Sequence, residues 1–301
     1  MTDVEKPLWR KIVDYPLVAM VIATALYILV ISLAGGLALA AIPPISGVSN
    51  EMKVYALSVP ALVALYWLVI ARLGDPRRND FEDLDWAKHL LLGLVGGTLI
   101  FSVAVAIAGA LGIYKIVGFG TFDGLLAAII VPTIGAAVTE EMLFRGILFR
   151  WLEQFGGSWL ALVVTSALFG ASHLMNPHSS WIAAGGIALE AGVMLGAAYM
   201  LTRSLWLPMG IHAAWNFTQG EVYDIPVSGT KVEGILDARL QGDPLLTGFG
   251  FGLEASIIAI VVATLFGLWL LARAIRQGQL MKPSWVRRPI EQRDELAETF
   301  R

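Results

Sequence analysis

The sequence predicts an all-α polytopic membrane protein, with about eight transmembrane helices around an intramembrane polar cavity. Hydrophobic residues make up 57% of the 301 positions and charged residues only 15%, whereas a soluble globular chain carries about 25% charged residues. The mean hydropathy of +0.71 agrees with that composition. The apolar residues form long runs, and about twenty such residues are needed to cross the hydrocarbon layer. A few ionisable residues interrupt these runs, which is why we expect a polar cavity between the helices.

Eight of these runs are expected to be transmembrane helices. The first apolar stretch, 15–50, contains no charged residue and is too long for the core of a signal peptide, so we interpret it as a retained span. The seventh span is short, and its ends are the least well defined. The expected spans are 16–42, 56–73, 89–111, 124–149, 159–175, 181–201, 204–217 and 247–272.

The distribution of positive charge supports this topology. If the N-terminus is cytoplasmic, all but four of the 21 Lys and Arg residues fall in cytoplasmic segments, as the positive-inside rule requires. The four on the outer side are Lys53, Lys115, Lys231 and Arg239. We therefore expect both termini in the cytoplasm, a polytopic membrane domain over 1–276 with a catalytic core at about 124–219, and a charged cytoplasmic tail over 277–301. The compact chain and its charge asymmetry favour a prokaryotic plasma membrane.

The composition also narrows the range of functions. The chain has no cysteine, which excludes disulfides, thiolate metal sites and a cysteine nucleophile. No basic patch is large enough to indicate a nucleic acid as a partner. The lipid bilayer is thus the partner that the composition supports, and the sequence does not encode the oligomeric state legibly.

The segment 139–149, TEEMLFRGILF, places Glu140, Glu141 and Arg145 inside an otherwise apolar span. A charged side chain at the bilayer centre costs roughly 2.5–3.5 kcal/mol on insertion scales, so such residues indicate a functional site. Glu141 and Arg145 are four residues apart and can neutralise each other on one helix face. Glu140 lies about 100° from Glu141 around the helix, so the two carboxylates cannot both point at one site from an undistorted helix.

Two of the four histidines, His173 and His212, also fall inside expected spans. Asn216 follows His212 by four residues and shares its helix face. Counted from the turn expected near 155–158, Glu140 and His173 each lie about 22 Å along their helices, and His212 lies about 13 Å along its own. Helix tilt or a short loop can reconcile this difference, so the four groups can meet. A carboxylate that takes a proton from water, with imidazole and amide groups around it, is suited to hydrolysis.

Three motifs carry a family resemblance. They are EEMLFR at 140–145, FGASH at 169–173 and HAAWN at 212–216. In this order, and on separate hydrophobic spans, they resemble the motifs of the CPBP family of intramembrane endopeptidases. That family includes the CAAX prenyl endopeptidases and the bacteriocin-processing or immunity (Abi) proteins. The resemblance covers roughly 125–219, about a third of the chain.

The resemblance implies an eight-helix intramembrane endopeptidase that uses a glutamate-activated water. By this analogy Glu140 is the general base and His173 helps to position the water. His212 and Asn216 stabilise the oxyanion. Glu141 and Arg145 form a supporting ion pair that holds the helix in register. The implied substrate is a membrane-anchored peptide or protein, with a CAAX-type prenylated C-terminus as one member of that class, and no cofactor is required.

Two other interpretations remain open. In a zinc-dependent intramembrane protease, His173, His212 and Glu140 would supply three zinc ligands, but only the poorly oriented Glu141 would remain as base, so the metal-free scheme is favoured. A non-catalytic immunity or scaffold protein, or a proton-coupled transporter, would use the same groups differently, although no inverted repeat typical of transporters is visible. Glu190 lies mid-span outside the motifs, and the sequence assigns it no role.

Overall fold

The computed structural model describes residues 6–121 and 123–287, and it confirms the all-α polytopic architecture. Within these residues six helices are long and apolar enough to cross a membrane. They are Pro16–Ala41, Asn50–Arg72, Trp86–Ala110, Leu125–Met175, Trp181–Thr202 and Ile257–Arg276. The tail expected at 277–301 is described only as far as Arg287, and the rest of it lies outside the described residues.

These six helices contain seven of the eight expected spans. The spans expected at 124–149 and 159–175 are two helices that follow each other within Leu125–Met175 and are divided by a sharp turn at Gly157, where φ is 82° and ψ is 170°. The short seventh span is α10, Trp206–Phe217, extended by a π-helical turn at Thr218–Val222. The last span was placed too early, because its helix begins only at Ile257. Gly248, Gly250 and Gly252 have positive φ angles, and this backbone cannot continue a right-handed helix.

The bounds of the elements, in chain order, are α1 Leu8–Val13, α2 Pro16–Ala41, α3 Asn50–Leu68, the 3-10 turn Ile70–Arg72, α4 Trp86–Ala110, β1 Tyr114–Phe119, α5 Leu125–Ala128, the π-helix Ile129–Gly135, α6 Ala136–Glu141, the π-helix Met142–Phe149, α7 Arg150–Ser172, the 3-10 turn His173–Met175, α8 Trp181–Ile187, the π-helix Ala188–Gly192, α9 Val193–Thr202, α10 Trp206–Phe217, the π-helix Thr218–Val222, β2 Leu236–Leu240, α11 Pro244–Thr247, the 3-10 turn Leu253–Ala255 and α12 Ile257–Arg276.

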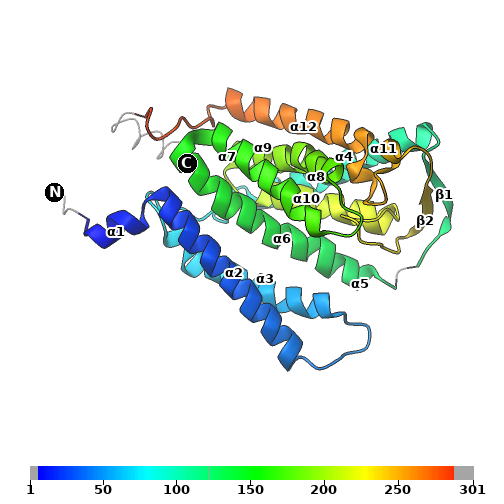
Figure 1. The fold of residues 1–301 in the computed structure, drawn as a ribbon, viewed down its shortest axis with the longest axis horizontal. Coiled ribbons are helices and arrows are strands. Elements are labelled where there is room, and N and C mark those ends of the chain that lie inside the picture. The colour runs from blue at the N-terminus through cyan, green and yellow to red at the C-terminus, as the bar shows by residue number, and fades with distance from the viewer. Residues whose placement is uncertain (1–5, 122, 288–301) are drawn as a thin grey trace.

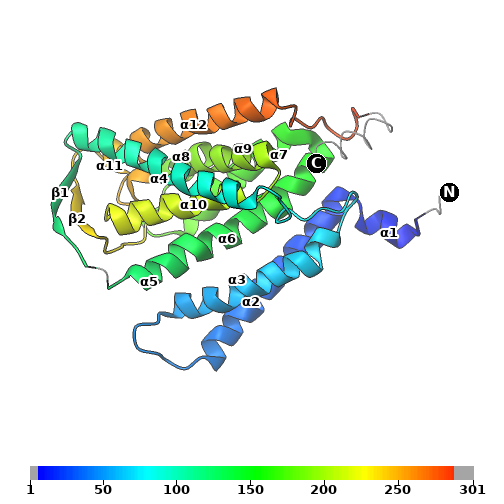
Figure 2. The ribbon, with the colours of Figure 1, turned by 180° about the vertical axis from the view of Figure 1, so that it is seen from behind.

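The helices form two groups. In Figures 1 and 2, α2 and α3 are a pair that lies beside the run α5–α6 and diverges from the larger bundle toward the α5 end. The bundle contains α4 and α7–α10, with α12 along its far side; α10 packs on α4, and α12 packs on α9. α1 and the last turns of α12 lie at the same end of the bundle. At the opposite end, β1 and β2 form an antiparallel pair that pairs Tyr114 with Leu240.

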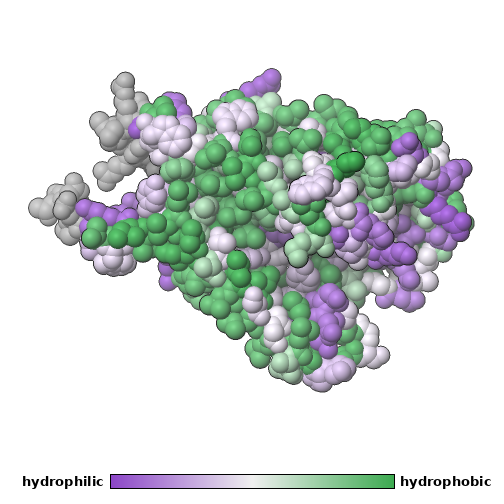
Figure 3. Space-filling view, viewed as in Figure 1, coloured by the Kyte–Doolittle hydropathy of each residue, from purple (hydrophilic) through white to green (hydrophobic). Residues whose placement is uncertain are grey.

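The outer faces of the helices are apolar, as Figure 3 shows for one side of the molecule. The large hydrophobic side chains that are more than half exposed include Val21 and Leu33 of α2, Leu91 and Leu99 of α4, Val163 of α7 and Leu265 of α12. A surface of this kind would be unfavourable in water. It is the surface that a transmembrane helix presents to lipid.

Glycines bring α10 against α4. A Cβ placed on Gly93 would lie 2.6 Å from the Leu207 carbonyl oxygen, and one placed on Gly97 would collide with the Ile211 carbonyl oxygen. Small residues of this kind allow two transmembrane backbones to approach closely. Because α10 carries His212 and Asn216, this contact fixes the position of both side chains.

The helix that carries the two glutamates alternates between α- and π-helical geometry. α6 is flanked by the π-helices Ile129–Gly135 and Met142–Phe149. Pro132 has no N–H, which leaves the Ala128 carbonyl without its usual donor, and the Thr133 hydroxyl donates to that carbonyl at 2.8 Å. π-Helical turns change the direction of the side chains beyond them and often occur at functional sites.

Candidate active site

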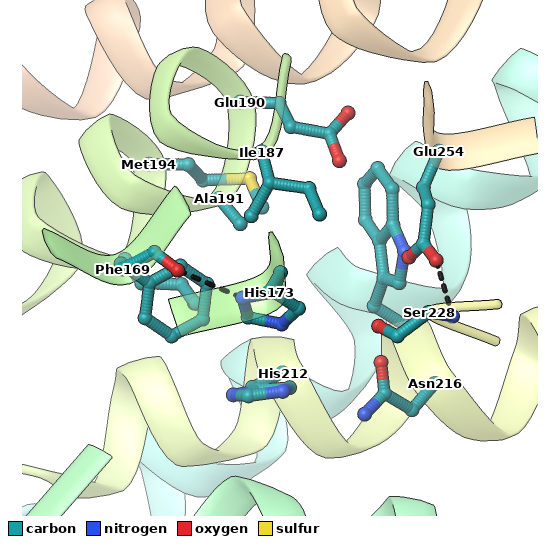
Figure 4. Close-up of a pocket in the computed structure, with 12 residues that line it drawn as sticks. Phe169, His173, Ile187, Glu190, Ala191, Met194, His212, Asn216, Ser228 and Glu254 are labelled. Atoms are coloured by element: carbon teal, nitrogen blue, oxygen red, sulfur yellow. Dashed lines mark hydrogen bonds between the residues drawn. The ribbon is translucent and has the colours of Figure 1, made fainter. Parts of the chain in front are cut away.

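A buried cavity lies at the centre of the bundle, and three of the expected site residues line it. His173 enters from the end of α7, and His212 and Asn216 enter from α10 (Figure 4). All three side chains are at least nine-tenths buried. The cavity volume is about 30 Å³, and a buried water needs roughly 10–15 Å³ by the same measure. The cavity therefore has room for about two waters beside the two imidazoles.

The hydrogen bond of His173 fixes the position of its proton. Its Nδ1 lies 2.7 Å from the Phe169 carbonyl oxygen, and because a carbonyl can only accept, Nδ1 must carry the hydrogen. In the neutral ring Nε2 then holds a lone pair. The Phe169 ring lies 4.9 Å from the His173 ring, measured between centroids. The Phe-x-x-x-His spacing thus both supplies the carbonyl and packs the imidazole.

Glu141, Arg145 and His212 form one hydrogen-bonded group. Glu141 Oε1 accepts from Arg145 Nη1 at 2.9 Å and from His212 Nδ1 at 2.9 Å. Glu141 and Arg145 are fully buried, and the ion pair expected from their spacing is present. The bond to His212 was not expected from the sequence, because it depends on the rotation of α10 against α6.

Arg145 extends this group to a third helix. Its Nη2 donates to the carbonyl oxygens of Ala191 and Gly192, each at 3.3 Å. Its guanidinium carbon lies 4.6 Å from the centroid of the Phe169 ring, which is within the range of a cation–π contact. Arg145 therefore connects the glutamate helix with the π-helix Ala188–Gly192 and with α7.

Glu140 lies on a different face of its helix from Glu141. It is half-buried, and its Oε2 atom has no hydrogen-bond partner among the described residues. Its charge interacts with His212, Tyr27 and Tyr55, which places it between α10 and the α2–α3 pair. Glu140 does not line the cavity itself. The structure thus brings His173, His212 and Asn216 to one cavity and leaves Glu140 beside His212.

A backbone carbonyl group holds the Asn216 side chain in place. Its Nδ2 donates to the Pro132 carbonyl oxygen at 2.7 Å, inside the π-helix Ile129–Gly135. One Nδ2–H bond is used in this way, and the second remains for another acceptor. The i, i+4 spacing of His212 and Asn216 places both on the face of α10 that meets the glutamate helix and the cavity.

Two further acids line the same cavity, Glu190 and Glu254 (Figure 4). Glu190 belongs to the π-helix Ala188–Gly192, and Glu254 to the 3-10 turn Leu253–Ala255. Glu190 could be noticed in the sequence as a charge in mid-span, although no partner could be named. Glu254 was placed inside the eighth expected span and was missed, because the glycine-rich loop that positions it was not anticipated.

The two imidazoles and the acids around the cavity are of the residue types that bind zinc. Within the described residues, no group of three or more His, Cys, Asp or Glu side chains is arranged to hold a metal ion. Both His173 and His212 use Nδ1 for protein hydrogen bonds, which leaves the Nε2 lone pair of a neutral ring free, as in zinc-ligating histidines.

The comparison with protein families matches the region that contains this site. Residues 121–218 match the family model of the Rce1-like type II CAAX prenyl endopeptidases. This match covers about a third of the chain, and over these residues the chain is similar to that family. No curated protein and no solved structure matches the chain.

The Rce1-like region contains all three sequence motifs, and its bounds agree closely with the 125–219 over which the resemblance was noted. The protein is thus an integral membrane protein with an Rce1-like protease region and a helical membrane architecture. Glu190 lies within the Rce1-like region, whereas Glu254 lies outside it.

Proposed function

We propose that this protein is an intramembrane endopeptidase that hydrolyses a peptide bond of a membrane-associated substrate with a water activated by Glu140. One observation carries the proposal: His173, His212 and Asn216, all within the matched residues 121–218, meet at one buried, water-sized cavity. Hydrolysis needs a base for water and donors for the oxyanion, and these residue types supply both. No serine or cysteine nucleophile is needed.

The two adjacent glutamates have different roles in this scheme. A general base needs a free lone pair and access to the water that it activates. Glu141 is fully buried and its Oε1 already accepts two hydrogen bonds. Oε2 of each glutamate has no hydrogen-bond partner among the described residues, but Glu140 is only half-buried and lies outside the ion pair, so Glu140 is the better base and Glu141 is the positioning residue. In the substrate complex, water is expected between Glu140 and the imidazoles.

The hydrogen bonds of the other residues suit their proposed roles. With its proton on Nδ1, His173 presents the Nε2 lone pair and can orient a water by accepting its hydrogen. His212 can donate to an oxyanion through Nε2 only when both ring nitrogens carry hydrogen, and the Glu141 carboxylate on Nδ1 stabilises that cationic form. Asn216 offers its second Nδ2–H as a further donor.

The membrane setting supports a class of substrate and an orientation of the chain in the bilayer. We infer a membrane-anchored peptide or protein as substrate, with CAAX-type prenylated peptides as the first candidates because the matched family is named for them. The excess of Lys and Arg in the expected inner segments supports cytoplasmic termini. The placement of α1 and the end of α12 at one end of the bundle is consistent with this orientation. The host membrane is proposed to be a prokaryotic plasma membrane.

Cleavage of membrane-anchored and prenylated peptides by the detergent-purified protein tests the proposal. Glu140→Gln preserves the shape and removes the base, so it is expected to lower the rate by about 10²–10⁴-fold. Cleavage at the wild-type rate by Glu140→Gln would refute the assignment. A chelator arm separates the zinc scheme, since chelator-sensitive cleavage restored by zinc would replace the metal-free mechanism. Proton-coupled flux in proteoliposomes that survives Asn216→Ala would instead support a transporter.

A further inference from the structure

Glu190 and Glu254 face the cavity from the side opposite His212. In Figure 4, His212 and Asn216 lie along one wall, and the carboxyl groups of Glu190 and Glu254 lie across the space above them. The two acids are 1% and 5% exposed, respectively. They come from elements far apart in the chain, so their meeting at this cavity is a product of the fold.

Neither acid has an ion-pair partner within the described part of the chain. Glu190 Oε2 is buried without any hydrogen-bond partner. Glu254 Oε1 accepts from the Ser228 backbone N–H, and its charge interacts with His212 without forming an ion pair. Two other buried acids differ in this respect, since Glu141 is paired with Arg145 and Glu153 with Arg203.

Two ionised carboxylates that line one small buried cavity are strongly disfavoured, because each loses its hydration and repels the other. The charges of Glu190 and Glu254 do interact. Burial raises the pKa of Glu254 to about 7, although the Ser228 amide acts in the opposite direction. Near neutral pH, burial and mutual repulsion therefore favour a state in which one of the two acids keeps its proton.

A proton held at this place has a use in peptide hydrolysis. When the peptide bond breaks, its nitrogen must receive a proton, because an amide anion is too basic to leave unprotonated. The oxyanion donors and the base lie on the His212 side of the cavity. The leaving nitrogen therefore faces the opposite wall of the cavity, where the carboxyl groups of Glu190 and Glu254 lie.

We propose that Glu190 and Glu254 form the amine-side subsite of the protease, where one proton shared by the pair is given to the nitrogen of the scissile bond and the pair then holds the released amino group. This inference rests on the proposed function. As the C–N bond of the tetrahedral intermediate breaks, its electron pair stays on nitrogen, which takes the proton from the pair. The proton taken from water leaves Glu140 for the solvent, and the pair regains one from solvent. Each turnover consumes one water and no other co-reactant.

The test compares an amide with an ester. The probes are a membrane-anchored peptide that the wild type cleaves and its depsipeptide analogue, in which oxygen replaces the scissile N–H. An alkoxide leaves far more readily than an amide anion, so ester cleavage depends little on an acid. The double variant Glu190→Gln/Glu254→Gln is expected to lose about 100-fold or more on the amide and less than about 5-fold on the ester.

Glu221→Gln is the matched control. Glu221 is also buried, at 2% exposure, and its Oε1 also has no partner in the described residues, but it does not line the cavity. The ratio of ester to amide cleavage rates of the Glu221→Gln variant is expected to equal that of the wild type. Because the ratio is measured on one preparation, a loss of folded protein lowers both rates and leaves the ratio unchanged.

The outcomes separate cleanly. The subsite is supported if the ratio of ester to amide cleavage rates rises at least about 20-fold in the double variant and not in Glu221→Gln. The factor of about 20 is the expected loss on the amide divided by the expected loss on the ester. Equal losses on both probes show a structural role and overturn the inference, as does wild-type cleavage of the amide by the double variant. If the wild type cleaves neither probe nor any peptide of the panel, the proposed function fails and the subsite falls with it.

Discussion

Removing Arg145 tests whether the Glu141 group holds the site together. Arg145 is fully buried, forms an ion pair with Glu141 at 2.9 Å, donates to the carbonyl oxygens of Ala191 and Gly192, and lies over the Phe169 ring. Arg145→Met keeps an unbranched chain of similar volume but leaves the Glu141 carboxylate buried with His212 alone.

The expected cost follows from that unpaired charge. Breaking a buried ion pair by removing one partner costs about 3–5 kcal/mol. The double variant Arg145→Met/Glu141→Gln removes the isolated carboxylate as well, so it should regain about 2 kcal/mol of this loss. The coupling free energy of the two substitutions measures how much Arg145 stabilises the Glu141 carboxylate, separately from the packing of the Arg145 side chain.

The assay is the free energy of unfolding in mixed micelles titrated with a denaturing detergent. Arg239→Met serves as the control, because Arg239 is exposed on β2 and surface changes usually lie within about 0.5 kcal/mol of the wild type. If the single and double variants were equally unstable, or if Arg145→Met resembled Arg239→Met, the reasoning about a buried charge would be refuted.

Three further predictions follow. Gly97→Ala should push α10 away from α4 and lower both stability and activity, whereas Gly96→Ala, with open space beside it, should have little effect on thermal unfolding or peptide cleavage. Asn216→Ala should lower kcat by about 10²–10³-fold without a matching loss of stability. The pKa of Glu254 is raised to about 7 from the ordinary 4.5, so its protonated form contributes stability that is present below pH 4.5 and is lost as the pH rises to 7. Between pH 5 and pH 8 the free energy of unfolding should fall by up to about 3 kcal/mol. Glu254→Gln should abolish this fall.

The sequence could predict the residues of the site because their signals are local. Glu140, Glu141 and Arg145 stand out as charges within an apolar span, and the spacing of Glu141 and Arg145 is enough to predict their ion pair. The four-residue spacing of His212 and Asn216 likewise predicts a shared face. Even the sharp turn near 155–158 was predictable, and it appears as the bend at Gly157, where φ is 82°.

The remaining features depend on how distant segments meet. The bond between His212 and Glu141 requires the rotation of α10 about its axis, and the hydropathy of α10 does not determine that rotation. Residues 120–235 separate β1 from β2 in the chain, and although β2 alternates apolar and charged residues, that pattern does not name its partner strand. Glu254 reaches the cavity through a loop with several positive φ angles, so a count of apolar residues places it in the wrong element. Pattern reasoning thus identified the helices and motifs and missed the loop that completes the cavity.

The structure also explains why two adjacent glutamates suit this site better than one. The glutamate helix holds α10 at two places, through Glu141 to His212 and through the Pro132 carbonyl to Asn216. Glu141 carries out the first task; it is fully buried and its Oε1 already accepts from Arg145 and His212, so it is the less suitable of the two glutamates to take a proton from water. The neighbouring position, about 100° away around the helix, can carry a carboxylate that remains free. Because Glu141 is fixed by Arg145 and His212, the direction of Glu140 is fixed as well, so in the proposed mechanism the buried ion pair positions the base without taking part in the chemistry.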